Sequence, residues 1–127
     1  MAKIVFCEDD PMIRKLITAA MRDSGHDVRL AVDGEEGLAL IRDTRPDLVF
    51  SDVSMPKLDG YQLGDALRAS PDTAHIPLVF VTASVQRAQI VEAERHGGTG
   101  VLPKPFTMAE LRKRVTDLLP AGADDGR

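Results

Sequence analysis

Short apolar runs alternate along the chain with stretches in which apolar residues recur every three or four positions. The apolar runs cover residues 3–7, 28–32, 48–50, 76–81 and 99–102, and they predict five β-strands. The stretch after each run has the spacing of a helix with one apolar face, as in Ile13, Leu16, Ile17 and Ala20. Strands that are apolar on both faces, each followed by a helix, predict a parallel sheet covered by helices on both sides.

Residues that can cap a first helical turn precede four of the predicted helices. The expected N-caps are Asp10, Asp33, Ser84 and Thr107. Pro11 follows Asp10 and suits the first turn of a helix. Glu36 and Glu110 stand three positions after Asp33 and Thr107, which is the spacing of a capping box. The caps and the apolar pattern therefore indicate the same helix starts.

The length of 127 residues fits one compact domain, which we assign to residues 1–119. Residues 120–127 are small and polar, and we expect a flexible tail or the start of a linker. No apolar stretch approaches the ~20 residues that span a bilayer, and the N-terminus lacks a signal-peptide pattern, so we expect a cytoplasmic protein without a membrane partner. The net charge of −4 argues against direct nucleic-acid binding, which needs a concentrated basic surface.

Polar residues that can bind metal ions or take part in reactions follow four of the predicted strands. They are Glu8, Asp9 and Asp10 after the first strand, Asp52 after the third, Thr82 at the end of the fourth and Lys104 after the fifth. The carboxyl ends of parallel strands meet at one edge of the sheet, where doubly wound folds bind their ligands. A nucleotide-binding fold would place glycines after the first strand, but this chain has three acids there.

These residues suit phosphoryl transfer assisted by a metal ion. Converging carboxylates repel one another, and Mg²⁺ relieves that repulsion through oxygen ligands. Lys104 adds a positive charge and Thr82 a hydroxyl donor, which can neutralise the oxygens of a phosphoryl group in transfer. Asp52 is then the expected nucleophile, because carboxylates do form aspartyl phosphates. Taken singly, Asp52 could be a loop acid and Thr82 an ordinary strand-end residue, so the hypothesis rests on their combination.

The cysteine and the histidines indicate less about function. Cys7 is the single cysteine and ends an apolar run, so we interpret it as a core residue and not as a reactive thiol. His26, His75 and His96 lack the spacing of metal ligands, and we interpret all three as surface or loop residues.

The strand-end residues resemble the receiver domain of two-component response regulators, with the chemotaxis-type single-domain proteins most similar in length. The resemblance extends from Lys3 to about Leu119. It rests on Glu8-Asp9, on the pattern Asp-x-x-Met-Pro-x-x-Asp-Gly from Asp52 to Gly60, on Thr82-Ala83 and on Lys104-Pro105-Phe106. The resemblance implies a doubly wound (βα)5 three-layer sandwich, flavodoxin-like and CheY-like, with a five-stranded parallel sheet of order 2-1-3-4-5.

The resemblance also implies chemistry and partners. Asp52 would be the phosphoacceptor, supplied by a phosphohistidine on a sensor histidine kinase or a histidine phosphotransfer protein. The implied Mg²⁺ ligands are Asp9, Asp52, the backbone carbonyl of Ser54 and, through water, Glu8. The implied contacts of the phosphoryl oxygens are Thr82 and Lys104, the latter before a cis peptide bond to Pro105. The chain would catalyse only its own phosphorylation and dephosphorylation. The fourth helix, fifth strand and fifth helix would form the face that binds an unknown downstream protein or a second copy of the chain.

The sequence departs from the family's common pattern in three places. Glu8 replaces a more frequent aspartate, and Ser54 and Ser84 are small and neutral where the family sets the lifetime of the phosphoryl group. The largest departure is Val101, where the family usually has a phenylalanine or tyrosine that swings inward. Valine is too short for that movement. We therefore expect phosphorylation to move mainly the backbone after Thr82 and the fourth helix.

Three alternatives stay open. The chain could be the receiver of a longer regulator or hybrid kinase, cut before its output domain. A phosphate-ester hydrolase with an aspartyl nucleophile would carry a second acid two residues later, where this chain has Ser54. A phosphorylation-independent adaptor with this fold would usually lack one of the acids or the lysine, and none is missing here.

Overall fold

The structure is a computed structural model that describes residues 2–119, so the tail expected at residues 120–127 lies outside the described residues. Strands and helices alternate as predicted. In chain order they are β1 (Lys3–Cys7), α1 (Pro11–Met21), β2 (Asp27–Ala31), α2 (Gly34–Thr44), β3 (Leu48–Asp52), α3 (Gly60–Ala69), β4 (Leu78–Thr82), α4 (Arg87–Arg95), β5 (Gly100–Pro103) and α5 (Met108–Leu118).

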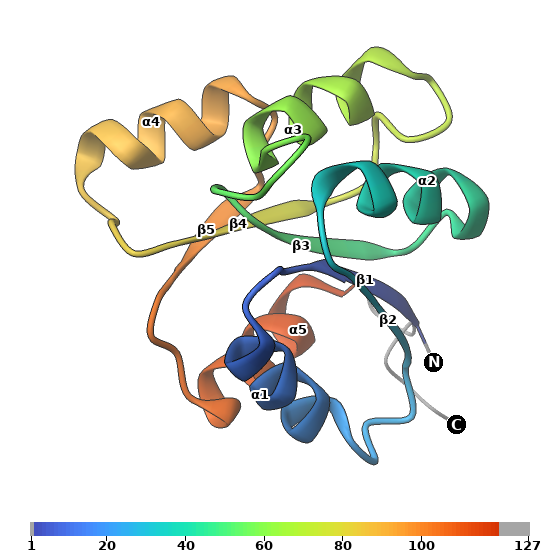
Figure 1. Ribbon diagram of the computed structural model, residues 1–127, viewed down its shortest axis with the longest axis vertical. Coiled ribbons are helices and arrows are strands. Elements are labelled where there is room, and N and C mark those ends of the chain that lie inside the picture. The colour runs from blue at the N-terminus through green and yellow to red at the C-terminus, as the bar shows by residue number, and fades with distance from the viewer. Residues whose placement is uncertain (1, 120–127) are drawn as a thin grey trace.

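The strands form one parallel sheet in the order β2-β1-β3-β4-β5. Helices α1 and α5 cover one face of the sheet and α2, α3 and α4 cover the other, which gives three layers (Figure 1). The predicted doubly wound sandwich and its strand order are confirmed. Because β1 and β3 are hydrogen-bonded neighbours, with Cys7 opposite Ser51, the residues that follow them emerge side by side at the carboxyl edge.

Alternate residues of each strand face opposite layers. In β1, Ile4 and Phe6 belong to the core cluster that includes α1 and α5 residues, whereas Val5 and Cys7 belong to the cluster beneath α2 and α3. Phe6 stacks on Phe50 of β3 with ring centroids 4.9 Å apart. Each fully buried side chain of this kind stabilises the fold by about 1.5–3 kcal/mol. The interpretation of Cys7 as a core residue is confirmed, since 2% of its surface is exposed.

Side chains cap most helix starts, as expected. Asp10, Asp33 and Thr107 accept hydrogen bonds from the first turns of α1, α2 and α5, and Thr107 with Glu110 completes a capping box. At α2 the predicted box is incomplete, because Glu36 accepts from the backbone N–H of Val32 and not from that of Asp33. The structure adds a capping box at α3 that the sequence analysis did not predict, between Asp59 and Gln62.

The prediction that Ser84 caps the fourth helix is wrong. Helix α4 begins at Arg87 with Gln86 at its N-cap, and no side chain accepts a hydrogen bond there. The backbone N–H of Ser84 donates instead to Thr82 Oγ1 at 3.3 Å, which holds this segment in a turn after β4. The predicted strand bounds differ from the observed ones by two residues or fewer. Pro77 lacks the N–H that a ladder needs, so β4 starts at Leu78 and not at Ile76.

Within the part of the chain that the structure describes, no helix combines the length and the apolar character that crossing a bilayer requires.

Candidate metal and phosphoryl site

The carboxyl edge of the sheet brings three acidic side chains together. Glu8 and Asp9 directly follow β1, and Asp52 is the last residue of the neighbouring strand β3. Each offers a carboxylate oxygen, and these oxygens all lie within 4.8 Å of one another. Asp9 is exposed to solvent, whereas only 2% of the surface of Glu8 and 8% of that of Asp52 is exposed. Their convergence follows from the register of the parallel strands β1 and β3.

Lys104 places its ammonium group between two of these carboxylates. Its Nζ donates a hydrogen bond to Asp52 Oδ2 at 2.7 Å and lies 3.3 Å from Glu8 Oε1. The backbone N–H of Lys104 donates to the carbonyl oxygen of Thr82 at 2.8 Å, which ties the lysine to the end of β4. The peptide bond between Lys104 and Pro105 is cis, as the family resemblance implied. Sequence positions 52 residues apart are thus joined by one ion pair.

The pKa values of Glu8 and Lys104 both rise above their ordinary values, for different reasons. Burial raises the pKa of Glu8; the Asp10 N–H bond and the charge of Lys104 oppose that rise, and the charge of Asp52 adds to it. Burial lowers the pKa of Lys104, but the hydrogen bond to Asp52 and the negative charges of Glu8 and Asp52 outweigh that effect. Lys104 is therefore charged at neutral pH and partly neutralises the acidic edge.

Backbone groups fix the two buried carboxylates further. Glu8 Oε2 accepts from the N–H of Asp10 at 3.1 Å, and Asp52 Oδ1 accepts from the N–H of Ser54 at 3.3 Å. Gly60 packs against the backbone of Asp52 and Val53. Its N–H donates to the Val53 carbonyl oxygen at 2.8 Å, and a Cβ at position 60 would collide with the Asp52 carbonyl oxygen. The glycine of the Asp-Gly motif therefore permits the close approach of α3 to the end of β3.

Thr82 and Ser54 also lie at this edge. Thr82 is the last residue of β4, and its hydroxyl accepts a hydrogen bond from Ser84. Ser54 is exposed two positions after Asp52. Asp10, by contrast, uses its carboxylate to cap α1 through the N–H of Met12 at 2.8 Å. One edge of the sheet thus holds Glu8, Asp9, Asp52, Thr82 and Lys104. Asp10 is not part of this cluster, because its carboxylate caps α1.

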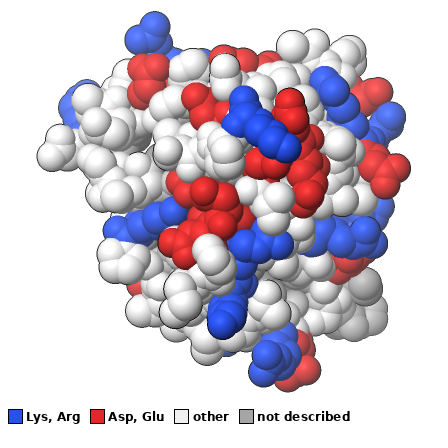
Figure 2. Space-filling model, viewed as in Figure 1, with Lys and Arg blue, Asp and Glu red and all other residues white. Residues whose placement is uncertain are grey.

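The donor set fits a hard divalent cation. Mg²⁺ binds proteins through one or two carboxylates and keeps several waters, so it needs convergent oxygens that are open to solvent. Figure 2 shows acidic side chains gathered near the centre of the viewed face with basic side chains directly beside them. Glu8, Asp9 and Asp52 supply the convergent oxygens, and the exposed Asp9 shows that the cluster opens to water.

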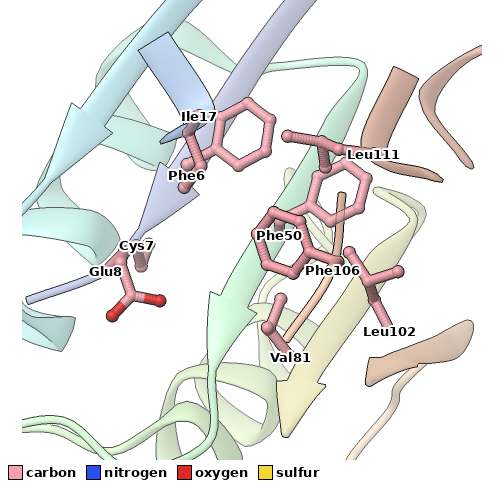
Figure 3. A pocket seen from close by; sticks show the side chains of 9 residues that line it. All are labelled: Phe6, Cys7, Glu8, Ile17, Phe50, Val81, Leu102, Phe106 and Leu111. Carbon is pink, nitrogen blue, oxygen red and sulfur yellow. The ribbon is translucent and has the colours of Figure 1, made fainter. Parts of the chain in front are cut away.

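A small cavity lies behind this edge and is a separate feature. Its volume is about 10 Å³, which is room for about one water-sized probe. Its lining is almost wholly apolar, and Figure 3 shows the Glu8 carboxylate pointing away from the rings of Phe6, Phe50 and Phe106. The cavity is too small and too apolar for a substrate, so the chemistry belongs to the open edge.

Sequence reasoning missed one residue that supports the acidic edge. Arg14 lies in the first turn of α1, and its Nη1 donates at 2.9 Å to the carbonyl oxygens of both Glu8 and Ala31. It thereby ties the ends of β1 and β2 to α1. The only signal in the sequence was a basic residue one helical turn after Asp10, a common arrangement on helix surfaces.

The fold and the site together define a doubly wound α/β domain with an acidic cluster and a paired lysine at the carboxyl edge of its sheet. The family model described as the response regulator receiver domain matches residues 4–116. The chain therefore belongs to the response regulator receiver family of two-component signalling systems.

Known proteins of this family match most of the chain. It is 37% identical over 119 residues to the DNA-binding dual master transcriptional regulator RpaA of Synechocystis sp., and the match covers 94% of this chain and 49% of that protein. The chain thus spans about half the length of this relative. The structure of the chemotaxis response regulator CheY4 of Vibrio cholerae superposes with a TM-score of 0.88 at 32% identity, over 94% of this chain and 99% of that one.

A second similar structure contains a magnesium ion. It is the receiver domain of the sensor histidine kinase PA1611 from Pseudomonas aeruginosa, with a magnesium ion coordinated in its active site cleft. The TM-score is 0.83 at 28% identity, over 92% of this chain and 96% of that one.

Proposed function

We propose that this chain is a phosphorylation-activated receiver in which Asp52 accepts a phosphoryl group in a Mg²⁺-dependent reaction. The donor is a phosphohistidine on a sensor histidine kinase or on a histidine phosphotransfer protein. The observation that carries the proposal is the position of the Asp52 carboxylate, which lies at an open edge between Lys104 at 2.7 Å and the acidic pair Glu8-Asp9.

The chain's own residues account for most of the transfer. A carboxylate oxygen of Asp52 attacks phosphorus, the P–N bond of the phosphohistidine breaks, and its electron pair stays on the imidazole nitrogen. Lys104 and Thr82 supply a positive charge and a hydroxyl for the phosphoryl oxygens. Glu8, Asp9, Asp52 and the Ser54 carbonyl would hold Mg²⁺, which would supply further positive charge to the transferring group when bound.

The chain catalyses only its own phosphorylation and dephosphorylation. A hydrolase of external phosphate esters needs an acid to protonate its leaving group. Two residues after Asp52 the chain has Ser54, which is exposed and carries no carboxyl group. An adaptor that needs no phosphorylation would not require Lys104 to reach both buried carboxylates.

The proposed output surface is formed by α4, β5 and α5, and it binds a downstream protein or a second copy of the chain. Val101 in β5 is half-buried against the core beneath α3 and has too few atoms for a large swing. Phosphorylation at Asp52 would therefore act through the segment after Thr82 and through α4. This activity belongs to a cytoplasmic protein that binds neither nucleic acid nor a membrane directly.

A second candidate is the same chemistry within a longer regulator. The chain spans 49% of RpaA but 99% of CheY4, so both arrangements occur among its relatives. The two candidates share Asp52 and differ only in what receives the signal.

Labelling with acetyl phosphate tests the proposal without any knowledge of the kinase. With Mg²⁺ present, the wild-type chain should form an acid-stable, base-labile phosphoprotein, and with EDTA in place of Mg²⁺ it should not become labelled. Asp52→Asn should reduce labelling to background. Asp72→Asn is the matched control. Asp72 is exposed, pairs with Arg45 and lies in the loop before β4, whereas the acidic edge lies at the carboxyl ends of the strands. Undiminished labelling of Asp52→Asn refutes the assignment of the phosphoacceptor.

A further inference from the structure

The two ends of α4 are attached to the rest of the molecule in different ways. At its C-terminal end, His96 lies between two helices: Nδ1 is 2.8 Å from Asp65 Oδ1 of α3, and Nε2 is 2.9 Å from Glu92 Oε1 of α4. The imidazole also stacks on the ring of Tyr61 in α3, with centroids 4.6 Å apart and an interplanar angle of 18°. One side chain thus joins α4 to α3 through three contacts.

The backbone beside His96 strengthens this attachment. Arg68 of α3 donates to the Gly97 carbonyl oxygen from Nε at 3.1 Å and from Nη2 at 2.6 Å. Gly64 of α3 packs directly on the His96 carbonyl oxygen, where a Cβ would collide with it. The C-terminal end of α4 therefore docks closely on α3.

The N-terminal end of α4 has much weaker attachments. No side chain caps it at Gln86, and Ala93 near the other end is the helix residue that is buried. Among residues 2–119, Gln89 Oε1 is a buried side-chain oxygen that accepts no hydrogen bond, which makes its present position costly. Val85, just before the helix, and Ile90, in its middle, are exposed by 42% and 37%. Few contacts oppose a displacement of this end.

We propose that protonated His96 anchors the C-terminal end of α4 to α3, so that α4 pivots about this anchor and the anchor weakens when His96 loses its proton. The geometry requires the charged ring. Both ring nitrogens face carboxylate oxygens, and only imidazolium carries a proton on each nitrogen. A neutral ring would set a lone pair against one of the two carboxylates.

The groups around His96 agree with this protonation state. From α3 it faces Asp65 and Tyr61, and Arg68 of the same helix bonds the adjacent Gly97 carbonyl oxygen. From α4 it faces Glu92, whose other oxygen lies 3.7 Å from Arg95. Hydrogen bonds to Asp65 and Glu92 raise the pKa of His96 above its ordinary value. The contribution of the anchor is therefore complete below the ordinary histidine pKa and is lost as the pH rises through the raised one.

The anchor exists without phosphorylation, and only its use as a pivot during signalling rests on the proposed function. From the sequence we expect movement of the segment after Thr82 and of α4. The anchor specifies which end moves: the end near Thr82 is free to shift, and the end at His96 stays with α3.

Amide hydrogen exchange of the unphosphorylated chain tests the anchor. Rates are compared at about pH 5.5 and about pH 8.5, on either side of the ordinary histidine pKa of about 6.5, and divided by the intrinsic rate at each pH. Protection of the α4 amides near Ala93 should fall by about threefold to tenfold at the higher pH, while β1 amides stay unchanged. His96→Gln should show the low protection at both pH values. His75→Gln is the matched control, since His75 is an exposed loop histidine, and it should behave as wild type.

Equal protection of α4 at the two pH values in the wild type, or an unchanged pH dependence in His96→Gln, overturns the proposal. NMR titration of the wild-type ring gives a second, independent readout. The His96 pKa should exceed the ordinary value and should fall in Asp65→Asn, and a value at or below the ordinary one also overturns it. All of these measurements omit a phosphodonor, so their failure would leave the role of Asp52 standing.

Discussion

Replacement of Lys104 by methionine should destabilise the metal-free protein, and most strongly at neutral pH. Methionine keeps an unbranched side chain one atom shorter but removes the charge that lies 2.7 Å from Asp52 and 3.3 Å from Glu8. The side chains of Glu8 and Asp52 are 3% and 11% exposed, so little water reaches them to replace the lost lysine charge.

The magnitude lies between two limits. Removal of one partner from a fully buried ion pair costs about 3–5 kcal/mol. An exposed ion pair contributes about 1 kcal/mol or less. Because the Lys104 side chain is 20% exposed, water screens part of the interaction. We therefore expect a loss of about 2 kcal/mol, which corresponds to a fall of about 8 °C in the thermal midpoint of a domain of this size.

The loss should depend on pH through Glu8. Burial raises the pKa of Glu8, so the folded protein holds this proton more tightly than the unfolded chain does. Stability from this group is therefore full below the ordinary glutamate pKa and falls as the pH rises through the raised value. Without Lys104 the pKa of Glu8 rises further, since the lysine charge lowers it in the wild type. The difference between variant and wild type should be largest near pH 7 and should shrink towards about pH 5.

Urea unfolding followed by circular dichroism measures this difference, because the chain has no tryptophan to report by fluorescence. Lys113→Met is the matched control: its Nζ pairs with Asp117 at 2.9 Å, but the two side chains are 77% and 52% exposed. The control should change the free energy of unfolding by less than about 0.5 kcal/mol. A Lys104→Met protein as stable as the control variant, or equally destabilised at both pH values, refutes the electrostatic reasoning.

Two further predictions concern close packing around the site. Gly60→Ala should destabilise the fold by about 1–3 kcal/mol and slow phosphorylation of Asp52, because the new methyl collides with the Asp52 carbonyl oxygen. Gly100→Ala is the control, since a Cβ at Gly100 would meet only Arg114 Nη1, at an ordinary contact distance of 3.9 Å. An equal effect of the two substitutions on labelling of Asp52 would contradict the role given to Gly60. Burial, and then the charges of Glu36, Asp33 and Glu8, raise the pKa of the Cys7 thiol to about 12. Iodoacetamide at pH 8 should therefore leave the native chain unmodified and alkylate Cys7 only in denaturant. Rapid alkylation of the native chain would contradict this prediction.

Local patterns in the sequence were sufficient to predict the architecture and to select polar residues that the structure brings together at one edge of the sheet. Strand and helix periodicity depends on residues a few positions apart, and so does capping by Asp10 and Thr107. The acids after β1 and β3 could be placed at one edge because parallel strands end on the same side of a sheet. At Ser84 the local signal predicted the wrong helix start, because α4 begins three residues later, after Gln86, with no side-chain cap.

Contacts between distant segments required the tertiary structure. The ion pair between Lys104 and Asp52, the support of Asp52 by Gly60 and the hydrogen bonds of Arg14 depend on how α1, α3 and β5 pack against strand ends. The sequence showed His96 only as an unremarkable polar residue. Its position between Asp65 and Glu92, 31 and 4 residues away, arises from the docking of α4 on α3. Sequence spacing carries information within one element, whereas the geometry between elements is set by the packing of the whole core.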